Sequence, residues 1–353
     1  DPELCDLSWR LGHHSFGLPI LAAAMDGVVD PAFASNFHQL GGLAVMNLEG
    51  LHGRYQDPAP VYRRIADASP EQAPALLQEI YAVPICDDLV RAAVGKAKAG
   101  GARLAVSVTP AGTERLAPIA IEAGADILVV QSTVTSARHV SATGWSLDLG
   151  SLCRNSPVPV IVGNTVSYDA AMALMEAGVS AILVGVGPGA ECTSRQVLGI
   201  GLPQISATLE VTAARDVYWQ ATGRRVAVIT DGGMQVSGDM VKALAAGADA
   251  IMLGAPLARA LEAPGLGFNW GMASPHGSLP RGTRINVGAH APLGQIVNGP
   301  SSVTNGTQNL AGAIRTAMAV LGATTIQDLH RVRMAHAPAI TVEGKLYQRG
   351  GRV

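Results

Sequence analysis

The chain repeats one short phrase, in which a helical stretch ends in Ala-Gly and an uninterrupted apolar run follows almost at once. Glycine readily adopts the left-handed conformation that stops a helix, and a continuous apolar run is typical of a parallel strand covered on both faces. The phrase therefore predicts repeated helix-to-strand units and an α/β fold. It occurs at residues 123–130, 177–184 and 246–253, with a weaker version at 99–106.

Further apolar runs bring the number of candidate strands to eight, with helical stretches between most of them. Eight such units in 353 residues predict a (β/α)₈ or TIM barrel, folded as a single domain over residues 1–353. An open doubly wound sheet is the alternative. The barrel is favoured because Gly-rich and polar residues repeatedly follow the strands, as the catalytic face of a barrel requires. The additional runs are 19–23, 43–47, 158–162 and 226–230.

Composition and charge exclude several other classes of protein. With 48% hydrophobic and 15% charged residues, the chain can bury a large core. A formal net charge of −2 without a basic stripe argues against a nucleic-acid partner. The apolar runs are too short to cross a membrane. Four cysteines without paired spacing, and no CxxC or HExxH, predict reduced thiols and a cytoplasmic protein without a zinc site.

A long Gly- and Pro-rich excursion over residues 263–300 follows the eighth strand. It ends before a helical stretch at residues 309–321. Loops of that length in compact domains are usually functional lids or disordered, so we expect a flap in this region.

The densest chemical signal follows the sixth strand, where the chain reads Gly185-Val-Gly-Pro-Gly-Ala-Glu-Cys-Thr-Ser-Arg195 and then Gly199-Ile-Gly-Leu-Pro-Gln204. Its first residues satisfy the dinucleotide fingerprint Gly-x-Gly-x-x-Ala, but Pro188 lies inside the turn and no clean helix follows. A second interpretation is a cradle for a thiolate, which is the nucleophilic form of cysteine. Cys192 is the only cysteine so placed, although an inert small residue in a loop would look the same.

This loop resembles the catalytic loop of the IMP dehydrogenase/GMP reductase family, and the chain looks closest to the short IMP-dehydrogenase-related proteins that lack CBS domains. The resemblance implies that Cys192, with Thr193 beside it, attacks a purine nucleotide. Matching segments follow in the expected order along nearly the whole chain: Ala24-Met-Asp-Gly27, Gly163-Asn164, Asp231-Gly-Gly233, Met252-Leu-Gly254, Glu262-Ala-Pro-Gly265 and Gly271-Met272.

The same resemblance assigns the binding residues. Asp231 would hold the ribose hydroxyls, although an aspartate there could equally cap the next helix. Amides of Gly232, Gly233, Gly254 and Ala255 would bind the phosphate, as barrels commonly do after strands seven and eight. The substrate site would also include Met25, Ala190, Met272 and Ala273. The site for NAD, with NADP as an alternative, would include Gln131, Ser132, Asn164, Gly185 and Glu262.

The family also implies a potassium ion bound by the main-chain carbonyls of Gly187, Gly189 and Cys192, and a homotetramer or octamer. The chain departs from the family in several places. No CBS pair interrupts residues 48–84, and Ala190 and Ala255 stand where serine is frequent. The flap lacks the Arg-Tyr pair that activates water in bacterial IMP dehydrogenases. Arg281 and Arg284 are the nearest candidates for that role, and both could equally be surface arginines.

We therefore expect oxidation of IMP to XMP with NAD, through a covalent adduct of Cys192 with purine C2, as a step towards GMP. One alternative is a GMP-reductase-like deaminating reduction of GMP, or of a modified purine nucleotide, with NADPH. A non-catalytic nucleotide-binding regulator is the other.

Overall fold

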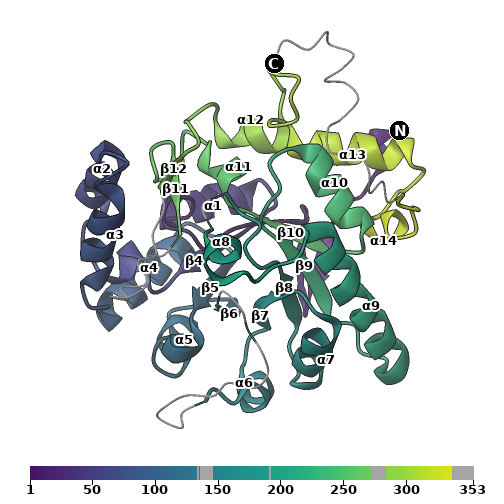
Figure 1. Ribbon diagram of the computed structural model, residues 1–353, viewed down its shortest axis with the longest axis horizontal. Coiled ribbons are helices and arrows are strands. Elements are labelled where there is room, and N and C mark those ends of the chain that lie inside the picture. Colours follow the sequence, from purple (N-terminus) through teal and green to yellow (C-terminus); the bar gives the residue numbers. More distant parts are fainter. Residues whose placement is uncertain (133–134, 136–145, 191, 272–283, 336–353) are drawn as a thin grey trace.

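Eight parallel strands close into a barrel in the order β10-β3-β4-β5-β6-β7-β8-β9, which confirms the predicted TIM barrel and excludes the open sheet (Figure 1). The protein is represented by a computed structural model that describes residues 1–132, 135, 146–190, 192–271 and 284–335. The barrel strands are β3 (Ile20–Ala22), β4 (Leu43–Asn47), β5 (Leu104–Val108), β6 (Ile127–Gln131), β7 (Val160–Thr165), β8 (Ala181–Val184), β9 (Ala227–Asp231) and β10 (Ala250–Leu253).

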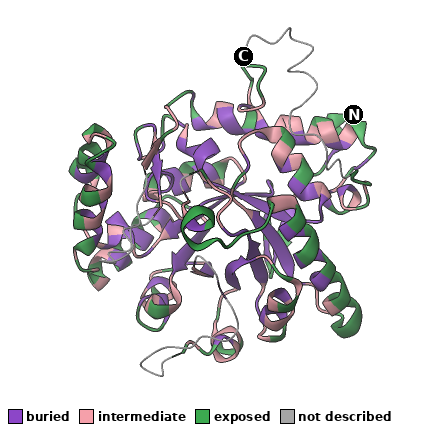
Figure 2. Ribbon diagram, viewed as in Figure 1, coloured by how far each residue is buried: buried purple, intermediate pink, exposed green. Residues whose placement is uncertain are grey.

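The register brings the carboxyl ends of the strands to one rim. Leu253 of β10 pairs with Ala22 of β3, and Met252 pairs with Asp231 of β9. Figure 2 shows that the strands are buried. Their side chains divide between one apolar cluster inside the barrel and another shared with the helices. Residues that directly follow the strands therefore gather around one opening.

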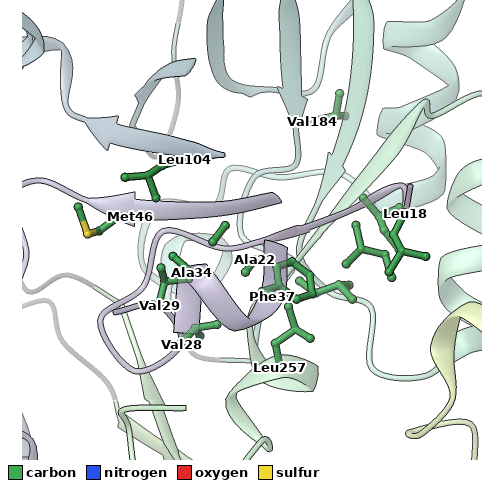
Figure 3. Packing of buried hydrophobic residues seen from close by; sticks show 14 of the residues in the cluster. Leu18, Ala22, Val28, Val29, Ala34, Phe37, Met46, Leu104, Val184 and Leu257 are labelled. Carbon is green, nitrogen blue, oxygen red and sulfur yellow. The ribbon is translucent and has the colours of Figure 1, made fainter. Parts of the chain in front are cut away.

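Helices pack around the barrel where the Ala-Gly phrases predict them. Three of the phrase glycines, Gly124, Gly178 and Gly247, have positive φ angles of 103°, 99° and 102°, which suit glycine at a helix end. In the shared core, Ala34 and Phe37 of α1 lie near Ala22 of β3 (Figure 3). The outer helices are α1 (Pro31–Gln39), α4 (Asp87–Ala99), α5 (Thr113–Glu122), α6 (Leu149–Asn155), α7 (Tyr168–Glu176), α9 (Gln204–Thr222) and α10 (Ser237–Ala245).

Elements near both ends of the described chain pack against the barrel and its helices. The hairpin of β1 (Trp9–Leu11) and β2 (His14–Phe16) adds Trp9 and Phe16 to the apolar interior of the barrel. The helical stretch predicted near residues 309–321 is α13 (Leu310–Val320), which begins after the capping side chain of Asn309. The chain also forms η1 (Pro2–Leu4), η3 (Pro110–Gly112) and α14 (Ile326–Leu329).

Two excursions lie beside the barrel and contact each other. Between β4 and α4 the chain forms η2 (Leu51–Gly53) and a hairpin of α2 (Ala59–Asp67) and α3 (Ala73–Ala82). Within residues 263–300, where the sequence indicated a long loop, β11 (Phe268–Trp270) pairs with β12 (Arg284–Asn286), and α12 (Leu293–Asn298) follows. Figure 1 shows this β11–β12 ribbon between the hairpin and the barrel. In the described part of the chain, we find no helix with the length and apolar character needed to span a membrane.

Candidate active site

Three side chains from different strands meet at the rim of the barrel. Asn164 of β7 donates from Nδ2 to Oδ2 of Asp231, the last residue of β9, over 2.8 Å. Gln131, the last residue of β6, donates from Nε2 to the same carboxylate oxygen over 3.1 Å and to Oδ1 of Asn164 over 3.0 Å. The two amides thereby fix the orientation of the carboxylate.

Asp231 does not cap the following helix. Helix α10 begins at Ser237, six residues later, and Oδ2 of Asp239 accepts hydrogen bonds from the amides of Gln235 and Val236 there. The helix-cap interpretation of Asp231 is therefore wrong, and the half-buried carboxylate stays at the barrel opening.

Gln204 joins the ends of two neighbouring strands. Its Nε2 donates to the carbonyl of Val184 in β8 over 2.6 Å and to the carbonyl of Asp231 in β9 over 3.1 Å. A Cβ atom on Gly185 would lie 2.3 Å from that Asp231 oxygen, so only glycine fits where the loop leaves β8. Gln204 belongs to the motif after the sixth strand, but the sequence alone predicts no role for it in the site.

Cys192 lies half-buried in the loop after β8. Its thiol donates to the hydroxyl of Ser194 over 3.3 Å, and its amide donates to the carbonyl of Gly189 over 3.1 Å. Thr193 precedes α8 (Ser194–Leu198), a five-residue helix. The dinucleotide fingerprint is thus a chance match. The sheet is a closed barrel, and the motif is followed by this short helix instead of the long helix that a dinucleotide site requires.

The cysteine loop packs against the glycines that follow Asp231. A Cβ atom on Gly233 would approach Cβ of Pro188 to 2.9 Å, and one on Gly232 would lie 3.1 Å from Cγ of Pro188. The structure therefore brings together the two segments that were predicted to carry the nucleophile and the ribose-binding carboxylate. In Figure 1, α8 lies across the barrel opening.

A second group forms at β10 and β3. Gly254 follows β10 and begins the short helix α11 (Ala255–Ala258), in which Ala255 is buried. Sδ of Met25, in the loop after β3, lies 2.9 Å from where a Cβ atom on Gly254 would stand. Met25 and the predicted phosphate turn are therefore neighbours. Met272, Ala273 and Arg281 lie outside the described residues.

Of the other predicted residues, Ser132 contacts Asn164 of the rim cluster, whereas Glu262 contacts the start of α12. Glu262 accepts a hydrogen bond of 2.8 Å from the amide of Leu293, at the start of α12. Ser132 pairs through its hydroxyl with Thr135 over 2.8 Å and accepts the Asn164 amide at its carbonyl. Gly185 is buried, while Ala190 is exposed and Gly187 is half-buried.

Arg284 is engaged at the end of α2. Its guanidinium donates to the carbonyls of Ile65, Ala66 and Ala68 and lies 4.2 Å from the ring centroid of Phe268. Burial lowers the pKa of Arg284. Its N–H groups donate to the α2–α3 hairpin. Among the described residues, no hydrogen bond joins Arg284 to the cysteine loop or to the Asp231 cluster.

In the cysteine loop, the ligand atoms available to a cation are main-chain oxygens. Among the described residues, no group of three or more His, Cys, Asp or Glu side chains could hold a metal ion. The Gly189 carbonyl, which accepts the Cys192 amide, keeps a second lone pair. Carbonyl oxygens are hard ligands that suit a hard cation such as potassium.

A buried polar chain near Met25 was not predicted from the sequence. The carboxylate of Asp26 accepts hydrogen bonds from Oη of Tyr81 over 2.5 Å and from the Leu51 amide over 3.1 Å. Nε1 of Trp270 donates to the same Tyr81 oxygen over 2.9 Å. Burial raises the pKa of Asp26 to about 6, although the hydrogen bonds from Tyr81 and Leu51 act to lower it. Only Asp26 lay within a recognised motif.

Comparison with known proteins agrees with this architecture. Residues 2–274 match the family model described as "IMP dehydrogenase / GMP reductase domain". An uncharacterized oxidoreductase of Mycobacterium leprae is 40% identical over 335 residues, covering 92% of this chain and 89% of the relative. One of Mycobacterium tuberculosis is 38% identical over 334 residues with the same coverage.

A shorter match and a solved structure point the same way. Inosine-5'-monophosphate dehydrogenase of Aquifex aeolicus is 44% identical over 146 residues, which cover 41% of this chain and 28% of that protein. The crystal structure of an IMP dehydrogenase/GMP reductase-like protein from Corynebacterium glutamicum superposes with a TM-score of 0.90 at 35% identity, covering 96% of this chain and 90% of that one. The chain therefore belongs to the IMP dehydrogenase/GMP reductase family of oxidoreductases.

Proposed function

We propose that this protein oxidises IMP to XMP with NAD, through a covalent adduct between Cys192 and C2 of the purine. The observation that carries the proposal is the packing of the cysteine loop on the segment after Asp231, with the carboxylate oriented by Asn164 and Gln131. This packing supports a nucleophile and an acceptor for a ribose diol at one opening.

In the proposed reaction, the Cys192 sulfur bonds to C2 of IMP, and the hydrogen at C2 leaves as hydride. NAD supplies the nicotinamide that accepts this hydride. Water then attacks C2, the carbon–sulfur bond breaks, XMP leaves and the thiolate is restored. Overall, IMP, NAD⁺ and water give XMP, NADH and a proton.

The binding roles divide between the two groups of residues at the rim. Asp231 accepts the ribose hydroxyls, and the amides of Gly232, Gly233, Gly254 and Ala255 bind the phosphate next to Met25. Ala190, Met272 and Ala273 complete the substrate site in this proposal. Gln131, Ser132, Asn164, Gly185 and Glu262 are proposed to form the NAD site, in which Gln131 and Asn164 also orient Asp231.

A potassium ion bound by the carbonyls of Gly187, Gly189 and Cys192 is proposed to hold the cysteine loop in its reactive shape. The main-chain carbonyl oxygens of this loop, which are hard ligands, support this assignment. Replacing potassium with lithium at constant ionic strength should lower the rate of NADH formation. An equal rate in both salts would exclude the ion from the mechanism.

We further propose that residues 1–353 form one catalytic domain in which 263–300 acts as a flap, and that the enzyme works in the cytoplasm as a homotetramer or octamer. The family and the four free cysteines support these assignments. Size-exclusion chromatography with light scattering tests the assembly, and a monomeric mass would refute it.

A deaminating reduction of GMP, or of a modified purine nucleotide, with NADPH is the second candidate. The absence of an Arg-Tyr pair from residues 263–300 favours it, because hydrolysis of the adduct needs a group that activates water. The test is a matched pair of assays with purified protein: NADH formation from IMP and NADPH consumption with GMP. Activity only in the second assay would replace the proposed reaction, and activity in neither would leave a modified purine nucleotide as substrate or a nucleotide-binding regulator.

A further inference from the structure

We propose that Tyr81 is a positioning residue, whose single hydroxyl group joins the loop after β3 to the β11–β12 ribbon and so holds both in place around the nucleotide site. This inference rests on the proposed function for its effect on substrate, but the connection itself is a property of the fold.

The hydroxyl group of Tyr81 donates one hydrogen bond and accepts another. It donates to the Asp26 carboxylate over 2.5 Å and accepts from Nε1 of Trp270 over 2.9 Å. All three side chains are buried, with exposed fractions of 4% for Asp26, 3% for Tyr81 and 1% for Trp270. Buried charge-assisted hydrogen bonds are strong and costly to break, so these residues are expected to move together.

On one side of Tyr81, the loop after β3 is tightly enclosed. A Cβ atom on Gly50 would lie 2.1 Å from Oδ1 of Asp26, and one on Gly27 would lie 2.9 Å from the Phe268 carbonyl. The Gly27 carbonyl also accepts the Gly265 amide over 3.2 Å. Met25, next to Asp26, reaches the turn at Gly254. A shift of Asp26 would therefore move a neighbour of the proposed phosphate site.

On the other side, the ribbon is fastened to the α2–α3 hairpin at both of its strands. Trp270 of β11 is fastened through Tyr81 of α3, and Arg284 of β12 through the carbonyls at the end of α2. The hairpin occupies the position between the second barrel strand and the following helix. We infer that in this chain it serves to position the ribbon.

The same apolar cluster provides a matched control. Tyr62 of α2 packs beside Tyr81 and Trp270, and its ring centroid lies 6.2 Å from that of Trp270. The Tyr62 hydroxyl is buried without a hydrogen-bond partner among the described residues. Tyr62→Phe therefore removes a buried hydroxyl group from this cluster without breaking a hydrogen bond. Tyr81→Phe also removes one buried hydroxyl group, but it breaks the hydrogen bonds to both Asp26 and Trp270.

The experiment compares hydrogen exchange and kinetics in the full-length wild type, Tyr81→Phe and Tyr62→Phe. In Tyr81→Phe, amides of residues 24–29 and 265–270 should exchange faster, while those of β7 stay unchanged. The KM for IMP should rise by about tenfold, more than kcat falls, because the binding loop is misplaced while the nucleophile is intact. Tyr62→Phe should match the wild type in all three measurements.

Equal behaviour of the two variants would overturn the proposal, as would faster exchange with an unchanged KM. If the wild type turns over neither nucleotide, the proposed function fails, while the exchange comparison still decides whether Tyr81 joins the two segments. Should Tyr81→Phe not fold, Trp270→Phe breaks only the second hydrogen bond. It should speed exchange in residues 265–270 but not in 24–29, and faster exchange in neither segment would contradict the connection.

Discussion

Nδ2 of Asn164 lies 2.8 Å from Oδ2 of Asp231, so a side chain from β7 orients a carboxylate at the end of β9. We therefore propose that the two residues act as one unit in nucleotide binding, although they were expected to serve cofactor and substrate separately. A double-mutant cycle can therefore compare the contributions of Asn164 and Asp231 to IMP binding.

We expect Asp231→Ala to weaken IMP binding by about 1.5 to 3 kcal/mol, because it removes a charged acceptor for the ribose hydroxyls. Asn164→Ala should weaken binding less and add little in the Asp231→Ala background, since its effect passes through the carboxylate. Calorimetric titration of IMP into the four proteins of this cycle measures the coupling. Unchanged affinity in Asp231→Ala would remove Asp231 from the site, and strictly additive losses would separate the two residues.

Arg284→Ala and Arg281→Ala should differ in kind. Arg284→Ala leaves carbonyls at the end of α2 without their donors, so it should lower the free energy of unfolding by about 1 to 3 kcal/mol, as measured by denaturant titration. Arg281→Ala, if that residue activates water, should still transfer hydride in a single turnover and then stall as the covalent adduct. Loss of adduct hydrolysis in Arg284→Ala at full stability would reverse these assignments.

The buried carboxylate of Asp26 predicts a pH dependence of stability. Its pKa is raised from 3.8 to about 6, so between these values the folded protein holds a proton that the unfolded chain has lost. Its favourable contribution is therefore complete below pH 4 and is lost as the pH rises through 6. Relative to Asp26→Asn, the wild type should lose about 2 to 3 kcal/mol of unfolding free energy between pH 4 and 7. Parallel pH profiles for the two proteins would refute the shift.

The barrel was predictable from the sequence because its signals are local. Each Ala-Gly phrase contains both the helix stop and the strand that follows, and a strand end identifies the rim. Asp231 and Cys192 were predicted for the same reason, since one stands at the end of a strand and the other in the loop that follows a strand.

Contacts between distant segments were not predictable in this way. Tyr81 and Trp270 are 189 residues apart, and Arg284 meets carbonyls 216 and 218 residues earlier in the chain. The strands β11 and β12 have three residues each, which is too short for an alternating pattern to be visible. The role of Arg284 at α2 follows only once the hairpin is placed beside the ribbon.

The covalent role of Cys192 is tested most directly by quenching the reaction of IMP and NAD during turnover and locating the nucleotide on the protein by peptide mass spectrometry. We expect an adduct on Cys192, with NADH formed in step with it. Cys192→Ser should still bind IMP but form neither adduct nor NADH. NADH formation without an adduct, or more than about a tenth of wild-type activity in Cys192→Ser, a loss under ~1.4 kcal/mol, would contradict the mechanism.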